Sequence, residues 1–313
     1  MALTAAVEAR IVLDAARACG FELAGLTRAL PHADFDRYLD WVQGGLAAGM
    51  NYLTDHRAQV RDDPRKLMPS AVTMLCVGKL YNAAGPSPDE ASGWISRYAW
   101  GPRDYHETMR EDLKRVVDRL RPVLPDFDCR ILVDTAPLLE RSYAREAGLG
   151  WIGNNSCLIN QPQGSWFFLA EILFSFEVDA YGAPPPDRCG SCRKCIDACP
   201  TTALVAGERG WELDSAKCIS YWTIEAKTEA PDDLKQLFGN HLFGCDICQD
   251  VCPWNRRAPE TVDAAFQPVN ACPALVELSP EDFQTRFRGT PVARTKADGF
   301  NRNVRVALQN RGE

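Results

Sequence analysis

Seven cysteines of this chain fall into two runs whose spacing can bind iron-sulfur clusters. The first run is Cys189-x2-Cys192-x2-Cys195-x3-Cys199-Pro200, and the second is Cys245-x2-Cys248-x3-Cys252-Pro253. Cysteines separated by two residues can wrap one 4Fe-4S cubane, because the backbone between them curls around it. The cysteine before proline instead reaches the neighbouring cubane. The spacing therefore predicts two cubanes whose ligands cross over between the runs.

Two cubanes need eight thiolates, one more than the two runs supply. The first cluster is expected to use Cys189, Cys192, Cys195 and Cys252, and the second Cys199, Cys245, Cys248 and an eighth cysteine. Cys218 is the candidate for the eighth place because it lies between the runs, whereas its rival Cys272 lies beyond both. Paired CxxC motifs also occur in zinc ribbons, but zinc sites do not require the Cys-Pro endings. The module is therefore similar to a bacterial ferredoxin.

The bulk composition favours a globular protein in a reducing compartment. Hydrophobic residues make up 46% and charged residues 25% of the 313 residues, which leaves room for a main domain and a smaller module. Thirteen cysteines are an odd number in a chain much larger than disulfide-rich secreted domains, so metal ligation fits better than disulfides. Residues 1–20 indicate an amphipathic helix rather than a signal peptide, and the most apolar later stretch, 166–176, is too short to span a bilayer. We expect a cytoplasmic protein without a membrane segment.

The elements that must position the cysteines indicate an α/β first half. Predicted strands at residues 21–26, 72–77 and 129–133 alternate with predicted helices at 35–46, 105–120 and 138–147. A stiff Gly-Ala-Pro-Pro-Pro-Asp connector within residues 181–188 marks a domain boundary. We expect an α/β domain over 1–180, the cluster module over 181–258 and a loop and helical segment over 259–313, in which Ser279 caps a helix.

Two motifs of the first domain approach cofactor signatures without meeting them. Residues 148–153 match GxGxxG, but a dinucleotide site needs a strand before the glycines and a helix after them, and here the order is reversed. Asp104-x-His106-x-x-Met109 approaches the DxHxxG signature of proteins that ligate cobalamin through histidine, but its glycine is missing. Neither motif by itself assigns a cofactor to the domain.

A set of motifs that covers nearly the whole chain resembles the family of epoxyqueuosine reductases. The motifs are residues 96–99, 133–137 with Glu140 and Arg141, 148–155, the doubled cysteine module and 218–225. The resemblance implies that the epoxide oxygen of epoxyqueuosine is removed at the wobble position of tRNA, in a two-electron, two-proton reduction. It also implies a cobalamin without a protein lower ligand, in a domain resembling that of reductive dehalogenases, and supplied with electrons by the two clusters.

The resemblance assigns a proton donor and a set of cobalamin contacts. Asp134 matches the family's proton donor, and a partly desolvated pocket would raise its pKa for that role. The local alternative is that Asp134 or Thr135 caps a helix that begins near Pro137. Arg57 and Arg97 are candidates for the corrin periphery, because guanidinium groups suit carbonyl and phosphate oxygens. The other expected cobalamin contacts are Tyr98, Asp134, Asn155, Ser156, Ser165, Ser220, Tyr221, Thr223 and Glu225.

A chain with a net charge of −7 must meet tRNA through local positive charge. The expected phosphate contacts are Lys227, Arg256 and Arg257, and the tail over residues 284–313 is also cationic. Aromatic side chains can stack on unpaired anticodon bases or pack in the core; the candidates are Trp94, Trp100 and Tyr105. The further expected partner of this monomer is an external electron donor, a reductase or a flavodoxin- or ferredoxin-type protein. Several family members continue beyond the motif at residues 302–308 into a helical-repeat domain, so the tail is interpreted either as the truncated start of such a domain or as a naturally short form.

Two other functions share part of the pattern. A reductive dehalogenase-like corrinoid enzyme would use the same cofactors on small organohalides. A ferredoxin-like electron-transfer module would pass electrons to a partner and would have no substrate of its own.

Overall fold

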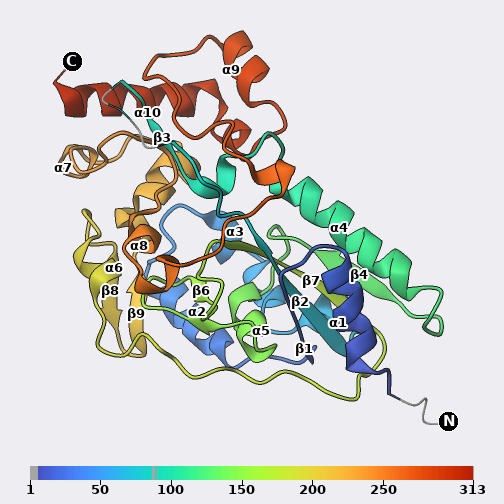
Figure 1. Ribbon diagram of the computed structural model, residues 1–313. Helices are drawn as coiled ribbons and strands as arrows, with labels where there is room; N and C mark the ends of the chain where they lie inside the picture. Colours follow the sequence, from blue (N-terminus) through green and yellow to red (C-terminus); the bar gives the residue numbers. More distant parts are fainter. Residues whose placement is uncertain (1–5, 87–88, 90, 313) are drawn as a thin grey trace.

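The computed structural model describes residues 6–86, 89 and 91–312, and a four-stranded antiparallel sheet forms the centre of its first half (Figure 1). The strands follow the order β1 (Leu23–Arg28), β2 (Thr73–Leu80), β7 (Phe167–Phe174) and β4 (Cys129–Leu132). The three predicted strands are confirmed as β1, β2 and β4, with ends displaced by at most three residues. The apolar stretch within 166–176 forms β7, which pairs with both β2 and β4.

Helices cover both faces of this sheet. Alternate side chains of a strand point to opposite faces, so Leu75 and Val77 of β2 join one core cluster, and Met74 and Cys76 join another. The first cluster lies under α1 (Ala9–Ala18) and α4 (Tyr105–Leu120), which run side by side in Figure 1, and the second lies under α5 (Glu140–Glu146). The short helices α2 (Asp34–Gln43) and α3 (Asn51–Thr54) follow β1. Residues 1–5 of the predicted N-terminal helix lie outside the described residues.

The residues 148–153 do not begin a helix after a strand. They follow α5 and lead into the hairpin of β5 (Trp151–Ile152) and β6 (Leu158–Ile159). Gly148 ends the helix with a φ of 85°, and a Cβ on Gly150 would lie 2.2 Å from the carbonyl oxygen of Ile159. The glycines are therefore explained by a left-handed turn and a close backbone approach.

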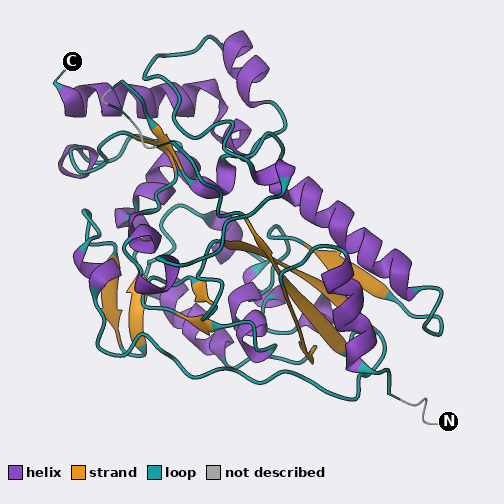
Figure 2. Ribbon diagram, viewed as in Figure 1, coloured by secondary structure: helices purple, strands orange, loops and turns teal. Residues whose placement is uncertain are grey.

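The cysteine-rich module is built from short elements, which Figure 2 shows beside the large sheet. In chain order they are α6 (Lys194–Asp197), the hairpin of β8 (Leu204–Gly207) and β9 (Gly210–Leu213), the π-helix η5 (Tyr221–Glu225), α7 (Asp232–Lys235), β10 (His241–Phe243) and α8 (Ile247–Asp250). Helices α6 and α8 each lie within a cysteine run and pack against each other. The two runs are therefore brought together by the fold.

The C-terminal segment folds back onto the first two segments. Its helices are α9 (Pro280–Phe287), capped by Ser279 as predicted, and α10 (Lys296–Arg311). A third core cluster joins Ile95 of β3 (Trp94–Ile95), Phe243 of β10 and Phe300 of α10, and β3 pairs with β10 in parallel. The division at residues 180 and 258 stays a prediction. Within the described residues, none of the helices has the length and apolarity needed to cross a membrane.

Candidate redox and proton-transfer site

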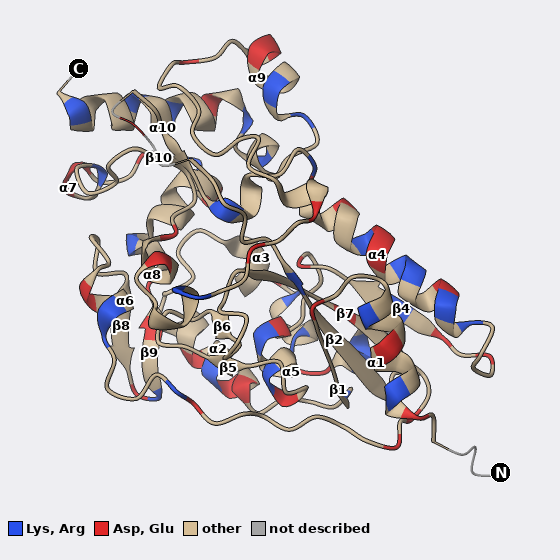
Figure 3. Ribbon diagram, viewed as in Figure 1, with Lys and Arg blue, Asp and Glu red and all other residues tan. Residues whose placement is uncertain are grey.

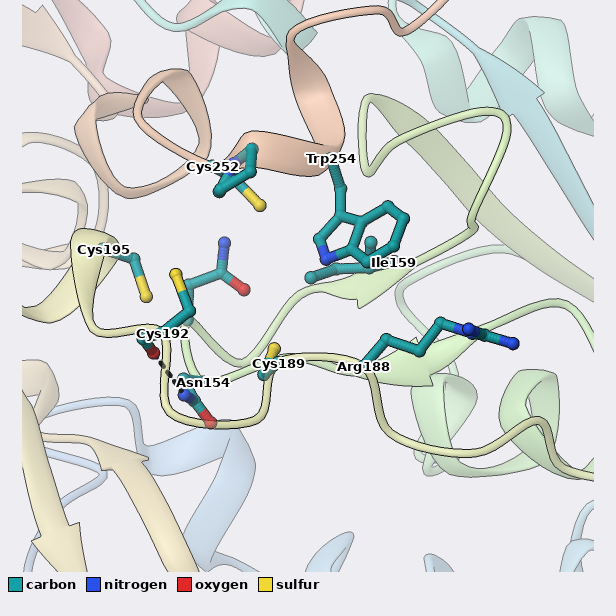
Figure 4. Close-up of a pocket in the computed structure, with 10 residues that line it drawn as sticks. Asn154, Ile159, Arg188, Cys189, Cys192, Cys195, Cys252 and Trp254 are labelled. Atoms are coloured by element: carbon teal, nitrogen blue, oxygen red, sulfur yellow. Dashed lines mark hydrogen bonds between the residues drawn. The ribbon is translucent and has the colours of Figure 1, made fainter.

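Four cysteines from both runs surround one cavity. Cys189, Cys192, Cys195 and Cys252 line a cavity of about 200 Å³, which also contacts Trp254. Figure 4 shows their sulfur atoms around the opening, and the side-chain amide of Asn154 donates a hydrogen bond to the Cys192 carbonyl at 3.1 Å. Four thiols around a space of this size are a suitable donor set for a cubane. The arrangement has the crossed composition that the spacing predicts.

The remaining run cysteines gather around Cys218. Burial raises the pKa of Cys245 to about 12, and the neighbouring thiols of Cys218 and Cys199 act in the same direction. Burial likewise raises the pKa of Cys248, and the neighbouring thiols of Cys157, Cys245 and Cys218 act in the same direction. Cys272 lies elsewhere, with its sulfur 3.7 Å from the carbonyl oxygen of Pro86. The structure thus brings Cys199, Cys218, Cys245 and Cys248 together and leaves Cys272 out.

The π-helix η5 connects the second thiol group to a separate cluster of polar side chains around Asp134, which is called here the Asp134 pocket. It begins three residues after Cys218 and ends at Glu225, whose carboxylate accepts a hydrogen bond from Arg294 at 2.8 Å. Thr223 is buried, and its hydroxyl donates to the Ile219 carbonyl and accepts from the Gly244 N–H. The helix is therefore fastened to the turn that carries Cys245.

Asp134 lies at the centre of this pocket. Its Oδ2 is 3.0 Å from Nε2 of His106, and Nδ1 of His106 is 2.6 Å from Oδ1 of Asp104. Asp134 has a φ of 50°, which is uncommon for a residue with a side chain, and its N–H donates to Glu140 at 2.9 Å. The ring of Tyr105 stacks on His106 with centroids 4.0 Å apart. Both ring nitrogens of His106 are thus held by carboxylates.

The proton of this pair lies on the imidazole rather than on the carboxyl group. Burial alone would raise the pKa of Asp134, but the hydrogen bond and charge of His106 outweigh it and hold the pKa below its usual value. Burial alone would lower the pKa of His106, but its bonds to Asp104 and Asp134 raise it to about 9. The raised pKa predicted for Asp134 is therefore wrong. The helix-cap alternative is also wrong, because α5 begins at Glu140 and no side chain caps it.

Two further acidic side chains lie behind Asp134. Burial raises the pKa of Glu140 to about 8, and the charge of Asp134 adds to the effect. Glu171 of β7 is fully buried, and neither of its carboxylate oxygens has a hydrogen-bond partner among the described residues. Burial and the charge of Glu140 raise its pKa well above the usual value. Because of these raised pKa values, the two carboxyl groups keep their protons and stay uncharged close to the Asp134 pocket.

Several residues of the pocket were not predicted from the sequence. Arg294, from the C-terminal segment, lowers the pKa of Asp134 and lies 5.8 Å from the ring centroid of Tyr52. Burial raises the pKa of Tyr52, and the charge of Glu225 adds to it. Tyr98 was predicted for the pocket, and its ring lies 6.1 Å from that of Tyr105. Only long-range folding brings these side chains together, so no local motif marks them.

The expected cobalamin contacts do not all face the pocket. Arg57 is half-exposed and pairs with Asp55 at 2.7 Å. Arg97 pairs with Asp250 at 3.1 Å and lies over the ring of Trp166. Both guanidinium groups therefore already have anionic partners.

The smaller expected contacts divide between the pocket side and the interior. Asn155 donates to the carbonyl of Cys248, and Ser165 is buried and bonds Gln249 at 2.8 Å. Ser156 has a φ of 63°, and its carbonyl accepts from Arg141. Ser220 lies beside Cys218, and the hydroxyl of Tyr221 accepts from the Gly49 N–H at 3.0 Å. The structure thus places Asn155 and Ser220 beside the second thiol group.

The expected tRNA contacts are separated in the structure. Lys227 is exposed just after η5, whereas Arg256 and Arg257 are exposed on the chain that leaves the first thiol group. Trp100 is only 1% exposed and packs in the third core cluster, so the core alternative is right for it. Tyr105 is stacked between His106 and Phe168 and lines the Asp134 pocket.

Comparisons with protein families match both halves of this site. A family model described as "4Fe-4S double cluster binding domain" matches residues 188–255. A second, described as "Epoxyqueuosine reductase QueG, DUF1730", matches residues 61–135, which include Tyr98, His106 and Asp134.

Curated relatives and solved structures match most of the chain. The epoxyqueuosine reductase of Xanthomonas campestris is 37% identical over 306 residues, which cover 94% of this chain and 84% of the relative. That of Leadbetterella byssophila is 39% identical over 290 residues and covers 91% and 93%. A crystal structure of an epoxyqueuosine reductase with a tRNA-Tyr epoxyqueuosine-modified stem loop superposes with a TM-score of 0.87 and 29% identity, covering 96% of this chain and 80% of that one. The Streptococcus thermophilus enzyme superposes with a TM-score of 0.86 at 27% identity, covering 96% and 81%.

Proposed function

The chain belongs to the epoxyqueuosine reductase family, and from this membership we propose that it reduces epoxyqueuosine to queuosine at the wobble position of tRNA. The reaction takes up two electrons and two protons, breaks both carbon–oxygen bonds of the epoxide, leaves an alkene and releases water. The observation that carries the proposal is the connection between the second thiol group and Asp134, which runs through Glu225 of η5 and Arg294.

Two 4Fe-4S clusters supply the electron path, as the double-cluster family match implies. We assign Cys189, Cys192, Cys195 and Cys252 to the first cluster and Cys199, Cys218, Cys245 and Cys248 to the second. The second cluster is the inner one, because Cys218 leads directly into η5 and the pocket. The first lies at an open cavity and is the outer one.

The contacts of His106 fit a cobalamin without a protein lower ligand. Both ring nitrogens of His106 are engaged by Asp104 and Asp134, so this imidazole is not free to ligate cobalt. The residues proposed to hold the corrin are Tyr98, Ser156, Ser220, Tyr221 and Glu225, with Arg57 and Arg97 at its periphery. When bound, cobalamin supplies a reduced cobalt centre that can transfer electrons to the epoxide carbons.

The His106–Asp134 pair supplies the first of the two protons to the departing oxygen, and the second proton is taken up from water. Near neutral pH the pair carries one proton, held mainly on His106 and shared across the 3.0 Å contact. Asp134 is the half-exposed member of the pair, so it can face the epoxide oxygen while His106 reloads it. The N–H bond to Glu140 holds Asp134 in its left-handed conformation and keeps its side chain on His106.

The remaining partners are proposed from charge and compartment. Lys227 lies at the exposed end of η5 and is suited to a tRNA phosphate near the pocket. Arg256 and Arg257 stay a prediction as phosphate contacts. The protein is proposed to be a cytoplasmic monomer that receives electrons from an external donor. The many free cysteines fit a reducing compartment.

Turnover tests the proposal. Anaerobic protein reconstituted with iron, sulfide and cobalamin, then reduced, is incubated with an epoxyqueuosine-containing stem loop, and the nucleosides are analysed by mass spectrometry. The expected product is lighter than epoxyqueuosine by one oxygen atom and requires both cofactors. Dehalogenation of an organohalide without any queuosine formation would favour the reductive dehalogenase-like alternative. Reducible clusters without cobalamin retention would favour an electron-transfer module.

A further inference from the structure

Five exposed basic side chains surround the first thiol group. They are Arg188, Arg193, Lys194, Arg256 and Arg257, and together they form what is called here the basic rim. Each lies within five residues of a cysteine that lines the cavity, and Arg188 itself lines it. In Figure 4 the side chain of Arg188 points away from the sulfur atoms. The rim therefore presents its charge to solvent around the opening of the cavity.

The rim is positive within an acidic chain. Residues 187–197 and 253–257 contain five basic and two acidic residues, a local charge of +3, whereas the whole chain carries −7. Of the two acids, Asp187 accepts a hydrogen bond from the Cys189 N–H, and Asp197 pairs with Arg193 at 3.4 Å. The other four rim residues have no ion pair within the described part of the chain. Figure 3 shows blue segments beside α6 and on the chain that follows α8.

Within the described residues, no hydrogen bond or ion pair joins a rim side chain to Asp134 or His106. The charged groups that act on Asp134 and Tyr52 are residues such as His106, Arg294 and Glu225, and no rim residue is among them. A tRNA stem loop is the rival occupant of this surface through Arg256 and Arg257, and the stem-loop measurement described below separates the two. An electron carrier needs this surface, because electrons must enter at the outer thiol group and transfer falls off steeply with distance.

We propose that the basic rim docks a small acidic one-electron carrier protein of the flavodoxin or ferredoxin type. This inference rests on the proposed function, in that the first thiol group holds the outer 4Fe-4S cluster. Half-buried Trp254 and exposed Pro253 provide a small apolar centre beside the opening, and charge surrounds it. Weak redox encounters use small interfaces of this kind, and opposite charges accelerate them. The carrier passes one electron at a time to the outer cluster and is itself oxidised by one electron per encounter.

Cluster reduction by a purified flavodoxin measures docking directly. Holoenzyme with both clusters is mixed with flavodoxin hydroquinone in an anaerobic stopped-flow instrument, and the visible absorbance of the clusters is followed. Arg188→Glu/Lys194→Glu and Arg256→Glu/Arg257→Glu are expected to lower the second-order rate constant at least about tenfold at low salt. The difference should disappear near 1 M salt, where the Debye length is about 3 Å. The matched control is Arg10→Glu/Arg119→Glu, which makes the same change in net charge on α1 and α4.

Two further measurements separate the outcomes. Dithionite at high salt should bleach the clusters of all variants equally, which shows that the thiol groups are intact. If flavodoxin reduces the rim variants at the wild-type rate, the docking proposal is overturned. An equal loss of rate in the rim variants and in the control variant also overturns it. Loss of stem-loop affinity in Arg256→Glu/Arg257→Glu with unchanged flavodoxin kinetics would make the rim an RNA surface and would also overturn it. Absence of any dithionite-reducible cluster in the wild type would overturn the proposed function and the docking proposal with it.

Discussion

Replacing His106 by glutamine tests whether the transferred proton is stored on the imidazole. With a pKa of about 9, His106 is about 99% protonated near pH 7, so almost every wild-type molecule starts with a loaded His106–Asp134 pair. In His106→Gln the proton must lie on Asp134 alone. A carboxyl group of ordinary pKa is protonated in only about one molecule in 1000 at that pH, and in the variant burial of Asp134 raises this fraction.

The single-turnover rate of queuosine formation should therefore fall by up to about 1000-fold near pH 7 in His106→Gln. The pH dependence should change with it. Wild-type activity should decline only as the pH passes about 9, whereas the variant should gain about tenfold for each unit of acidification. Rapid quench with an epoxyqueuosine stem loop, followed by nucleoside mass spectrometry, measures both effects.

His56→Gln is the matched control, because the side chain of His56 is 85% exposed and lies outside the pocket. It should keep the wild-type rate and pH profile. A wild-type rate near pH 7 in His106→Gln, with an unshifted alkaline limb, would refute the reasoning, since Asp134 would then obtain its proton from another source.

Three other substitutions test separate parts of the account. Cys218→Ala should remove about half of the bound iron while Cys272→Ala removes none, and iron analysis showing the reverse would reassign the eighth ligand. Asp134→Asn should keep both clusters and cobalamin by absorbance but lose turnover; an unimpaired variant would exclude the acid role. Glu140 has a folded pKa of about 8, above its unfolded value, so its contribution to stability is full at low pH and is lost as the pH rises towards 8. The free energy of unfolding of the wild type should fall by about 2 kcal/mol from pH 5.5 to 7.5 through this group. In urea titrations Glu140→Gln should lack that fall. The same dependence of unfolding free energy on pH in both proteins would contradict the role of Glu140.

The cysteine pattern could be predicted from sequence because its information is local. Cysteines separated by two or three residues, the last followed by proline, define how a short backbone segment curls, so the crossed grouping follows from spacing alone. Cys218 was predicted as the eighth ligand only from its position between the two runs. The strands β1, β2 and β4 were predicted for a similar reason, since apolar alternation and turn residues are local signals.

The proton-transfer site could not be predicted in the same way. His106 was noticed only as part of an incomplete cobalamin signature, and its contact with Asp134 joins residues 28 positions apart. Arg294 reaches the pocket because the C-terminal segment packs on β10 and η5, which no pattern in the tail indicates. The lowered pKa of Asp134 depends on that packing, so reasoning from an apolar strand alone gave the opposite direction.

Electron counting in a single turnover tests the central claim most directly, namely that two clusters feed the pocket of Asp134. Each 4Fe-4S cluster gives one electron, so in protein whose cobalt is at the Co(II) level the two reduced clusters hold the two electrons that one epoxide requires. Reconstituted enzyme is reduced, freed of excess reductant and mixed with one equivalent of epoxyqueuosine stem loop. The account predicts up to one queuosine per protein, formed as both clusters are reoxidised. Queuosine formed while the clusters stay reduced, or no queuosine from protein with its full complement of clusters and cobalamin, would contradict it.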